Sequence, residues 1–280
     1  MILATDPDAD RLGVYVKDSK TGDYHSLTGN MSGCLIGDYI IGQKKEKEGL
    51  PDDGAFIKSI VSTNMADAIA KYYGIELIEV LTGFKFIGQK ILEFENTKKG
   101  TYLFGMEESY GCLTGTYARD KDAIVASMAL CEAAAYYKTK NMTLWDAMLA
   151  MYEKYGYYKD HVESITLKGI EGLAKIKEIM ETLRKETLTQ IGGYQVLRVR
   201  DYANDTVTEL ATGSVTPTGL PNSNVLYYEL TDEAWVCVRP SGTEPKVKFY
   251  IGVKGESMED ADRKYEALGK AVLDKIHAMI

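Results

Sequence analysis

Three aspartates alternate near the start of the sequence, at Asp6, Asp8 and Asp10, and Arg11 follows them directly. Carboxylates with this spacing converge on one ion when the backbone curls, and ligand sets made only of oxygen favour Mg²⁺, Mn²⁺ or Ca²⁺. An EF-hand loop is excluded, because Arg11 and Lys17 stand where that loop needs glycine and glutamate. The alternative is a solvated acidic turn. Arg11 favours the metal loop, because a cation at this position suits an anionic substrate.

A second polar segment, residues 105–111, contains Glu107, Glu108 and Ser109 between two glycines and follows an expected strand. Ligands of α/β proteins bind at the carboxyl ends of parallel strands. Two acids and a hydroxyl could accept and donate hydrogen bonds to the vicinal hydroxyls of a sugar. Polar loops of this composition are common, however, so composition alone favours an ordinary surface loop.

A third segment, residues 239–245, contains Arg239, Ser241, Gly242 and Thr243 between two expected strands. The arginine offers a bidentate fork for phosphate, the hydroxyls add donors, and the glycine exposes backbone N–H groups to an anion. The segment is not a Walker A loop, since it lacks that spacing. Composition leaves a phosphate loop and a simple hairpin turn equally open.

The surrounding pattern predicts two kinds of domain. From residue 55 onward strand and helix patterns alternate, which is typical of βαβ units with a mainly parallel sheet. After residue 158 the pattern changes to several short strands bracketed by helices, which predicts an α+β domain. We expect helices at residues 31–47, 64–73, 84–95, 122–138, 143–155, 172–185 and 257–280. We expect strands at residues 1–5, 12–16, 55–62, 75–81, 101–104, 162–167, 195–200, 206–210, 225–230, 234–239 and 246–254.

Composition excludes several classes of protein. The 280 residues are 45% hydrophobic and 26% charged, as in ordinary globular domains. The formal net charge of −8 disfavours general nucleic-acid binding, and no apolar run reaches the ~18 residues of a membrane span. The four cysteines form no CxxC pair, and the amino-terminal segment lacks the basic region of a signal peptide. We therefore expect a cytoplasmic protein with neither nucleic-acid nor membrane partners.

Taken together, the order and separation of the three segments resemble those of the α-D-phosphohexomutase family, the phosphoglucomutases and phosphomannomutases. The resemblance covers nearly the whole chain and implies a parallel-sheet α/β phosphohexomutase domain followed by an α+β carboxyl-terminal domain. It identifies the first segment as a magnesium loop, the second as a sugar-hydroxyl loop and the third as a phosphate loop. The implied roles are Mg²⁺ ligands for Asp6, Asp8 and Asp10, charge stabilisation by Arg11, sugar binding by Glu107 and Ser109, and phosphate binding by Arg239, Ser241, Gly242 and Thr243.

Other segments also resemble the family. Thr82, Gly83 and Lys85 match a segment that helps to recognise the sugar. Lys121 matches a lysine proposed for proton transfer, which would act as a general base if its surroundings lower its pKa; an exposed lysine at a helix start is the alternative. Lys248 follows the phosphate loop and either reaches the phosphate or faces solvent. The form of residues 107–111 looks most like the long bacterial phosphoglucomutases, which favours glucose.

The sequence departs from the family in one respect. Family members have four domains, and a catalytic serine in the first domain carries the phosphoryl group. No such serine motif occurs here, and the metal loop, which sits late in the second domain of the family, comes first. The resemblance therefore implies a carboxyl-terminal half in three parts: 1–29 as the tail of domain 2, 30–158 as domain 3 and 159–280 as domain 4.

The family reaction moves phosphate between O1 and O6 of a hexose, with Mg²⁺ bound and a hexose 1,6-bisphosphate as activator. We accordingly expect glucose 1-phosphate and glucose 6-phosphate as ligands, and an amino-terminal half as a partner. Without the serine, the isolated chain is predicted to be inactive as an isomerase. The alternatives are a non-catalytic protein that binds sugar phosphates and, ranked below it, a metal-dependent phosphatase.

Overall fold

The computed structural model describes residues 1–242 and 244–280, and the chain forms two compact units, residues 1–156 and 157–280. The first contains these elements: β1 (Ile2–Thr5), β2 (Leu12–Lys17), β3 (Tyr24–Leu27), α1 (Gly29–Lys47), β4 (Gly54–Ser59), α2 (Met65–Tyr73), β5 (Glu76–Val80), α3 (Lys85–Thr97), β6 (Thr101–Glu107), β7 (Gly111–Leu113), α4 (Ala123–Thr139) and α5 (Leu144–Tyr155).

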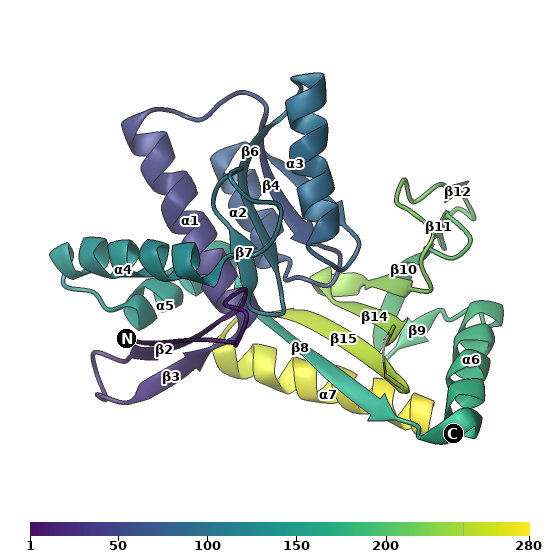
Figure 1. Ribbon diagram of the computed structural model, residues 1–280. Coiled ribbons are helices and arrows are strands. Elements are labelled where there is room, and N and C mark those ends of the chain that lie inside the picture. The colour runs from purple at the N-terminus through teal and green to yellow at the C-terminus, as the bar shows by residue number, and fades with distance from the viewer. Residues whose placement is uncertain (243) are drawn as a thin grey trace. The chain divides into compact units, whose positions relative to one another are not determined.

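The first unit has a four-stranded sheet in the order β5-β4-β6-β7, in which the first three strands are parallel and β7 is antiparallel. All six residues of β4 are buried, because helices cover both faces of the sheet. On one face α1 packs against β6, and the rings of Phe56 and Phe104 meet edge to face beneath it. Figure 1 shows α1 and α3 on either side of β4 and β6. On the face of α3, Ile87 and Ile91 pack against Ile57. The expected α/β domain with a mainly parallel sheet is confirmed.

A separate three-stranded antiparallel sheet, β1-β2-β3, lies at the start of the chain. Its strand β2 alternates between buried and exposed residues, and Leu12, Val14 and Val16 face inward. The inner face packs against α1, α4 and α5. Gly22, at a φ of +81°, makes the expected turn between β2 and β3. The loop between β1 and β2 contains the three aspartates, so this sheet fixes the position of the first polar segment.

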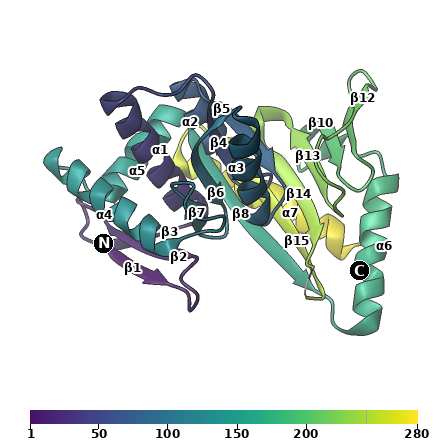
Figure 2. The same ribbon diagram turned by 45° about the horizontal axis from the view of Figure 1, so that its top comes forward.

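The second unit is an antiparallel sheet with helices, as expected for an α+β domain. Its elements are β8 (Tyr157–Thr166), α6 (Gly169–Lys185), β9 (Gln190–Ile191), β10 (Tyr194–Asp201), β11 (Thr206–Glu209), β12 (Val215–Thr216), β13 (Leu226–Leu230), the short 3₁₀ helix η1 (Thr231–Glu233), β14 (Trp235–Pro240), β15 (Lys246–Gly255) and α7 (Met258–His277). The sheet runs β12-β11-β10-β13-β14-β15-β8, and β9 pairs with β10. Figure 2 shows α7 lying along β15 and β8.

Helices α6 and α7 close one hydrophobic core in this unit. Ile176 and Ile179 of α6, and Leu268 of α7, belong to the same buried cluster as Phe249 and Ile251 of β15. These two β15 residues alternate with Lys248 and Tyr250, which therefore point to the opposite face of the sheet. Among the described residues, no helix is both long and apolar enough to cross a membrane.

Candidate functional site

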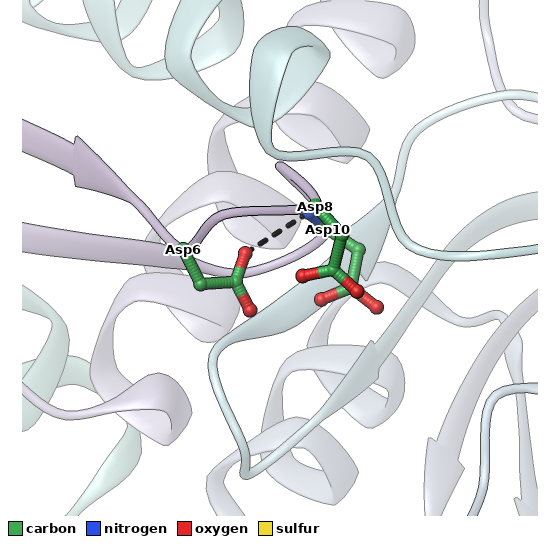
Figure 3. Close-up of side chains that lie close together, drawn as sticks. All are labelled: Asp6, Asp8 and Asp10. Atoms are coloured by element: carbon green, nitrogen blue, oxygen red, sulfur yellow. Dashed lines mark hydrogen bonds between the residues drawn. The ribbon is translucent and has the colours of Figure 1, made fainter.

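The first polar segment is a tightly curled loop between β1 and β2. Asp6 accepts hydrogen bonds through Oδ1 from the backbone N–H groups of Asp10, at 3.2 Å, and of Arg11, at 3.1 Å. The bond from Arg11 contributes most to lowering the pKa of Asp6. Ala9 adopts a φ of +55°, an uncommon conformation for a residue other than glycine. Figure 3 shows the result: the carboxylates of Asp6, Asp8 and Asp10 lie close together, with one oxygen of each within 4.8 Å of the others.

This donor set fits a hard cation. All three side chains offer carboxylate oxygens, which Mg²⁺ and Ca²⁺ prefer. Asp10 Oδ1 is buried and has no hydrogen-bond partner among the described residues, so it is a desolvated acceptor that a cation would satisfy. Arg11 is 53% exposed at its side chain, and its Nε lies 3.8 Å from the same oxygen. The arrangement is compatible with the expected metal loop, and the metal role of these residues stays a prediction.

The second polar segment differs from the expected loop, because β6 continues to Glu107 and β7 begins at Gly111. The two strands pair antiparallel, so the segment is the turn of a hairpin. Tyr110 occupies the turn at a φ of +69°, and its carbonyl accepts a 3.1 Å hydrogen bond from the N–H of Leu12, which follows the metal loop. Gly29 packs against the same turn, where an added Cβ would lie 2.1 Å from the carbonyl oxygen of Glu108.

Glu107 connects this turn to the segment before α3. Its carboxylate is 6% exposed, and Oε1 accepts a 2.6 Å hydrogen bond from the N–H of Gly83. Burial, followed by the neighbouring charge of Glu108, raises the pKa of Glu107. Gly83 has a φ of +116°, which directs its N–H at the carboxylate at no steric cost.

The remaining residues expected to bind the sugar are less constrained. Ser109 and Thr82 are partly buried at the turn and before α3 respectively. Lys85 begins α3, is exposed, and lies with its Nζ 4.9 Å from the ring centroid of Phe86.

Lys121 lies between the metal loop and the turn. Its side chain is 9% exposed, so the alternative of a solvent-exposed lysine is wrong. Nζ lies 2.8 Å from Asp10 Oδ2 and 3.0 Å from Asp120 Oδ1, and the aliphatic chain fills the space beside Gly111. Burial lowers the pKa of Lys121, but the bonds to Asp10 and Asp120 outweigh it and leave the pKa raised. The lowered pKa that a general base requires is therefore not present in this structure.

The third polar segment lies in the second unit, at the turn between β14 and β15. Arg239 and Lys248 stand directly opposite each other on adjacent strands and share one face of the sheet. Neither side chain forms an ion pair within residues 1–242 and 244–280.

The turn itself is closed by the Ser241 N–H, which donates to the carbonyl of Lys246 at 2.8 Å. Gly242 is exposed, and Thr243 lies outside the described residues. Within the part of the chain that the structure describes, the two cations have no ion-pair partner, and together with the exposed Gly242 they suit an anion.

The fold thus gathers the metal loop, Glu107, Gly83 and Lys121 in the first unit. Sequence reasoning missed two residues that support them, Lys58 and Ser59 at the end of β4, both fully buried. A lysine within an otherwise apolar strand pattern was the available signal, since buried lysines are rare unless they are paired.

Two family models match the chain. Residues 28–155 match the phosphoglucomutase/phosphomannomutase alpha/beta/alpha domain III, and residues 196–266 match the carboxyl-terminal domain of the same family. Together the two matches span more than half of the chain.

Curated relatives agree with these matches. A phosphoglucomutase of Staphylococcus aureus is 36% identical over 96% of this chain, and one of Staphylococcus epidermidis is 37% identical over 90% of it. The matches cover 47% and 45% of those relatives, so the chain spans about half the length of the curated proteins that it matches.

Solved structures share the fold. The exocytosis-sensitive phosphoprotein parafusin of Paramecium, a phosphoglucomutase in its open form, superposes with a TM-score of 0.66 at 22% identity. That match covers 99% of this chain and 45% of parafusin. An Aspergillus fumigatus N-acetylphosphoglucosamine mutase, in complex with GlcNAc-6P and magnesium, gives a TM-score of 0.51 at 15% identity, over 96% of this chain and 51% of the mutase.

Proposed function

Because the chain belongs to the phosphoglucomutase/phosphomannomutase family and matches its carboxyl-terminal domains, we propose that it provides the metal, sugar and phosphate sites of a phosphoglucomutase-type enzyme. The proposed substrates are glucose 1-phosphate and glucose 6-phosphate. A phosphoglucomutase assignment for curated relatives at 36–37% identity favours glucose. The nucleophilic serine would come from an amino-terminal half, and this half is the proposed partner of the chain.

One observation carries the proposal: Lys121 pairs with Asp10 of the metal loop and packs beside Gly111 of the turn that bears Glu107, although more than 100 residues separate Asp10 from Lys121. A surface acidic turn and an unrelated polar loop would not share a buried lysine. Direct contact between Asp10 and Lys121 instead fits a site where metal, sugar and proton chemistry occur together.

Each group has a chemical task in this proposal. Asp6, Asp8 and Asp10 would hold Mg²⁺, which when bound neutralises charge on a transferring phosphoryl group. Arg11 would add a positive charge beside the loop. Glu107, with its acceptor oxygens fixed by Gly83, would accept hydrogen bonds from sugar hydroxyls, and Ser109, Thr82 and Lys85 would add polar contacts.

The phosphate and proton roles are proposed on the same basis. Arg239, Ser241, Gly242, Thr243 and Lys248 would bind the phosphate that is not reacting. Lys121 keeps its proton while it pairs with Asp10 and Asp120. It would therefore become a base in the complete enzyme only when the charge of these carboxylates is compensated. The hexose 1,6-bisphosphate is the proposed activator of that enzyme.

Two alternatives remain distinct from this proposal. Sugar-phosphate binding without catalysis would use the same loops. A metal-dependent phosphatase requires a base beside the metal loop. The raised pKa of Lys121 argues against this candidate.

Calorimetric titration with glucose 6-phosphate tests the phosphate loop. Arg239→Ala removes the bidentate fork and should weaken binding by about 1.5–3 kcal/mol, roughly ten- to hundredfold. Arg239→Lys should also bind more weakly, because a point charge does not replace the fork. Lys270→Ala, on the exposed side of α7, is the control that removes one positive charge from the same unit. Equal affinity of wild type and Arg239→Ala would exclude this loop from the binding site.

A further inference from the structure

The two adjacent glutamates of the hairpin turn have different partners. Glu107 meets the N–H of Gly83, whereas Glu108 Oε2 accepts a 3.0 Å hydrogen bond from Ser59 Oγ. Ser59 is the last residue of β4 and is completely buried. The acceptor is a carboxylate, so this bond belongs to the stronger, charge-assisted class.

Ser59 is itself held in place by the segment that follows β4. Its Oγ lies 2.9 Å from Ser62 Oγ, and the N–H of Ser62 donates to the carbonyl of Ser59 at 3.0 Å. The next residue, Thr63, donates its N–H to Asn30 Oδ1 at 3.1 Å. Both serines are buried, so neither hydroxyl can exchange its partner for bulk water.

A buried cation anchors this segment to the sheet. Lys58 Nζ donates to the carbonyl of Thr63 at 3.3 Å and to Asn64 Oδ1 at 3.1 Å, and it lies 2.5 Å from Asp67 and 3.6 Å from Glu79. Lys58 is fully buried, whereas the side chain of Asp67 is 47% exposed. Loss of these acceptors would leave a buried ammonium without compensation, so the network determines where the chain leaves β4. The hydroxyl of Ser59 is thus presented by a part of the fold that cannot easily move.

The turn that receives this bond needs such support. Tyr110 has a φ of +69°, and conformations of this kind persist only where their surroundings over-determine them. On one side the turn is held by Gly29 and by the N–H of Leu12. Ser59 supplies a side-chain bond through Glu108, the residue between Glu107 and Ser109.

We infer that Ser59 is a positioning residue for sugar recognition, which acts by holding Glu108 so that the turn presents Glu107 and Ser109 to the ligand. The inference rests on the proposed function, because it takes this turn to be the sugar-hydroxyl loop. In this interpretation Glu108 holds the turn in place through its bond to Ser59, and Glu107 is the group that contacts the sugar. The other interpretation is a bond that stabilises the fold and has no influence on the ligand.

The test is the ratio of the affinities for glucose 6-phosphate and inorganic phosphate, measured by calorimetry on the full chain. Inorganic phosphate is assigned to the second unit, so a displaced turn in the first unit affects only the ligand that carries a sugar. The thermal unfolding of each variant shows whether the first unit stays folded. Ser59→Ala should lower the ratio roughly tenfold, the order expected for one bond to a charged group. Ser127→Ala is the control within the same unit, because its hydroxyl donates to the backbone carbonyl of Ala123 at 2.7 Å, within α4. It should leave the ratio unchanged.

Variants of Glu108 separate positioning from direct contact and do not depend on the folding of Ser59→Ala. Glu108→Gln keeps an oxygen acceptor for Ser59, so the ratio of the affinities for glucose 6-phosphate and inorganic phosphate should stay close to the wild-type value. Glu108→Ala should lower this affinity ratio as much as Ser59→Ala does. The double variant should lower it no further. A much larger loss in Glu108→Ala than in Ser59→Ala, or additive losses, would overturn the inference by making Glu108 a ligand in its own right.

The wild-type protein distinguishes the two possible failures. A wild-type preference for glucose 6-phosphate that Ser59→Ala retains in full overturns the positioning role alone. Equal wild-type affinities for glucose 6-phosphate and inorganic phosphate overturn the proposed sugar-binding function, and the inference falls with it.

Discussion

At the scale of single residues, Glu107 shows the energetic cost of burying a carboxylate. Glu107 is almost completely buried, and a backbone N–H from Gly83 compensates only in part for the water that its carboxylate has lost. Burial and the charge of Glu108 therefore raise the pKa of Glu107. A raised pKa means that the folded chain binds this proton more tightly than the unfolded chain does. The ionised carboxylate of Glu107 therefore destabilises the fold. It also keeps a hydrogen-bond acceptor at the position where a sugar hydroxyl would bind.

This cost predicts the behaviour of Glu107→Gln. Between the ordinary glutamate pKa of about 4.3 and the raised value, stability should fall as the pH rises, because the unfolded chain releases its proton first. The amide keeps the oxygen that accepts from Gly83 and carries no charge. The variant should therefore melt at a higher temperature than wild type at pH 7 and lose this part of the pH dependence. Its affinity for glucose 6-phosphate should fall.

Thermal unfolding monitored by circular dichroism from pH 4 to pH 8 measures the first effect, and calorimetry measures the second. Glu153→Gln, at an exposed position on α5, is the control and should change neither. A lower melting temperature for Glu107→Gln at pH 7 would show that the ionised carboxylate stabilises the fold.

Single residues also mark where sequence reasoning reached its limit. Asparagine is a favoured residue at the start of a helix, and Asn64 stands at that position before α2, but its side chain makes no capping bond. Its amide oxygen instead accepts from the buried ammonium of Lys58. No local pattern reveals this choice, because Lys58 is brought to Asn64 by the tertiary turn after β4. Likewise, the spacing of Asp6, Asp8 and Asp10 predicted a converging loop, whereas the pairing of Asp10 with Lys121 depends on the whole fold.

At the scale of elements, local chemistry was sufficient where caps and turns are encoded by short motifs. Gly74 ends α2 in the left-handed conformation, and Ser257 caps α7 through a bond from the N–H of Asp260, which are the roles typical of glycine and serine at helix ends. The sugar-hydroxyl segment was expected to be a loop, and it is the turn of a hairpin. The strand β7 has three residues, too few for an alternating pattern to identify it, and only its pairing with β6 defines it as a strand.

The capping box at the start of α5 provides a prediction at this scale. Thr143 accepts from the N–H of Asp146, and the Asp146 carboxylate accepts in return from the N–H of Thr143. Thr143→Ala should cost about 1 kcal/mol of the free energy of unfolding, which corresponds to roughly 2–4 °C in melting temperature for a unit of this size. Lys168→Ala is the comparison, since Lys168 occupies the same position before α6 and makes no capping bond. Equal melting temperatures for the two variants would show that the box contributes nothing.

At the scale of the whole molecule, the chain is organised as two units with separate cores. The sequence pattern was sufficient to predict one α/β unit and one α+β unit, because strands and helices alternate up to residue 155 and shorter strands follow. The division into three parts at residues 29 and 158 came from the resemblance and stays a prediction. Each unit contains its own part of the proposed ligand chemistry: metal and sugar groups in the first, and phosphate groups in the second.

The last prediction concerns catalysis by the full chain of 280 residues. The family reaction exchanges a phosphoryl group with a serine, and the sequence contains no serine motif of that kind. Loss of a nucleophile removes the chemical route itself, whereas loss of one binding contact only raises the barrier. The chain alone should therefore not interconvert glucose 1-phosphate and glucose 6-phosphate. Glucose 1,6-bisphosphate should not restore turnover, since none of the groups assigned here accepts its phosphate.

A coupled assay for glucose 6-phosphate, with Mg²⁺ and glucose 1,6-bisphosphate present, measures this directly. Because the relatives are about twice as long, the informative addition is a polypeptide corresponding to their amino-terminal half. Turnover that appears only with both polypeptides, and is lost again with Arg239→Ala, would support the mutase assignment. Binding of glucose 6-phosphate without turnover in any combination would favour the non-catalytic alternative. Turnover of roughly 1–10³ per second by the highly purified chain alone would contradict the prediction, because a nucleophile would then have to lie among the residues assigned here to binding.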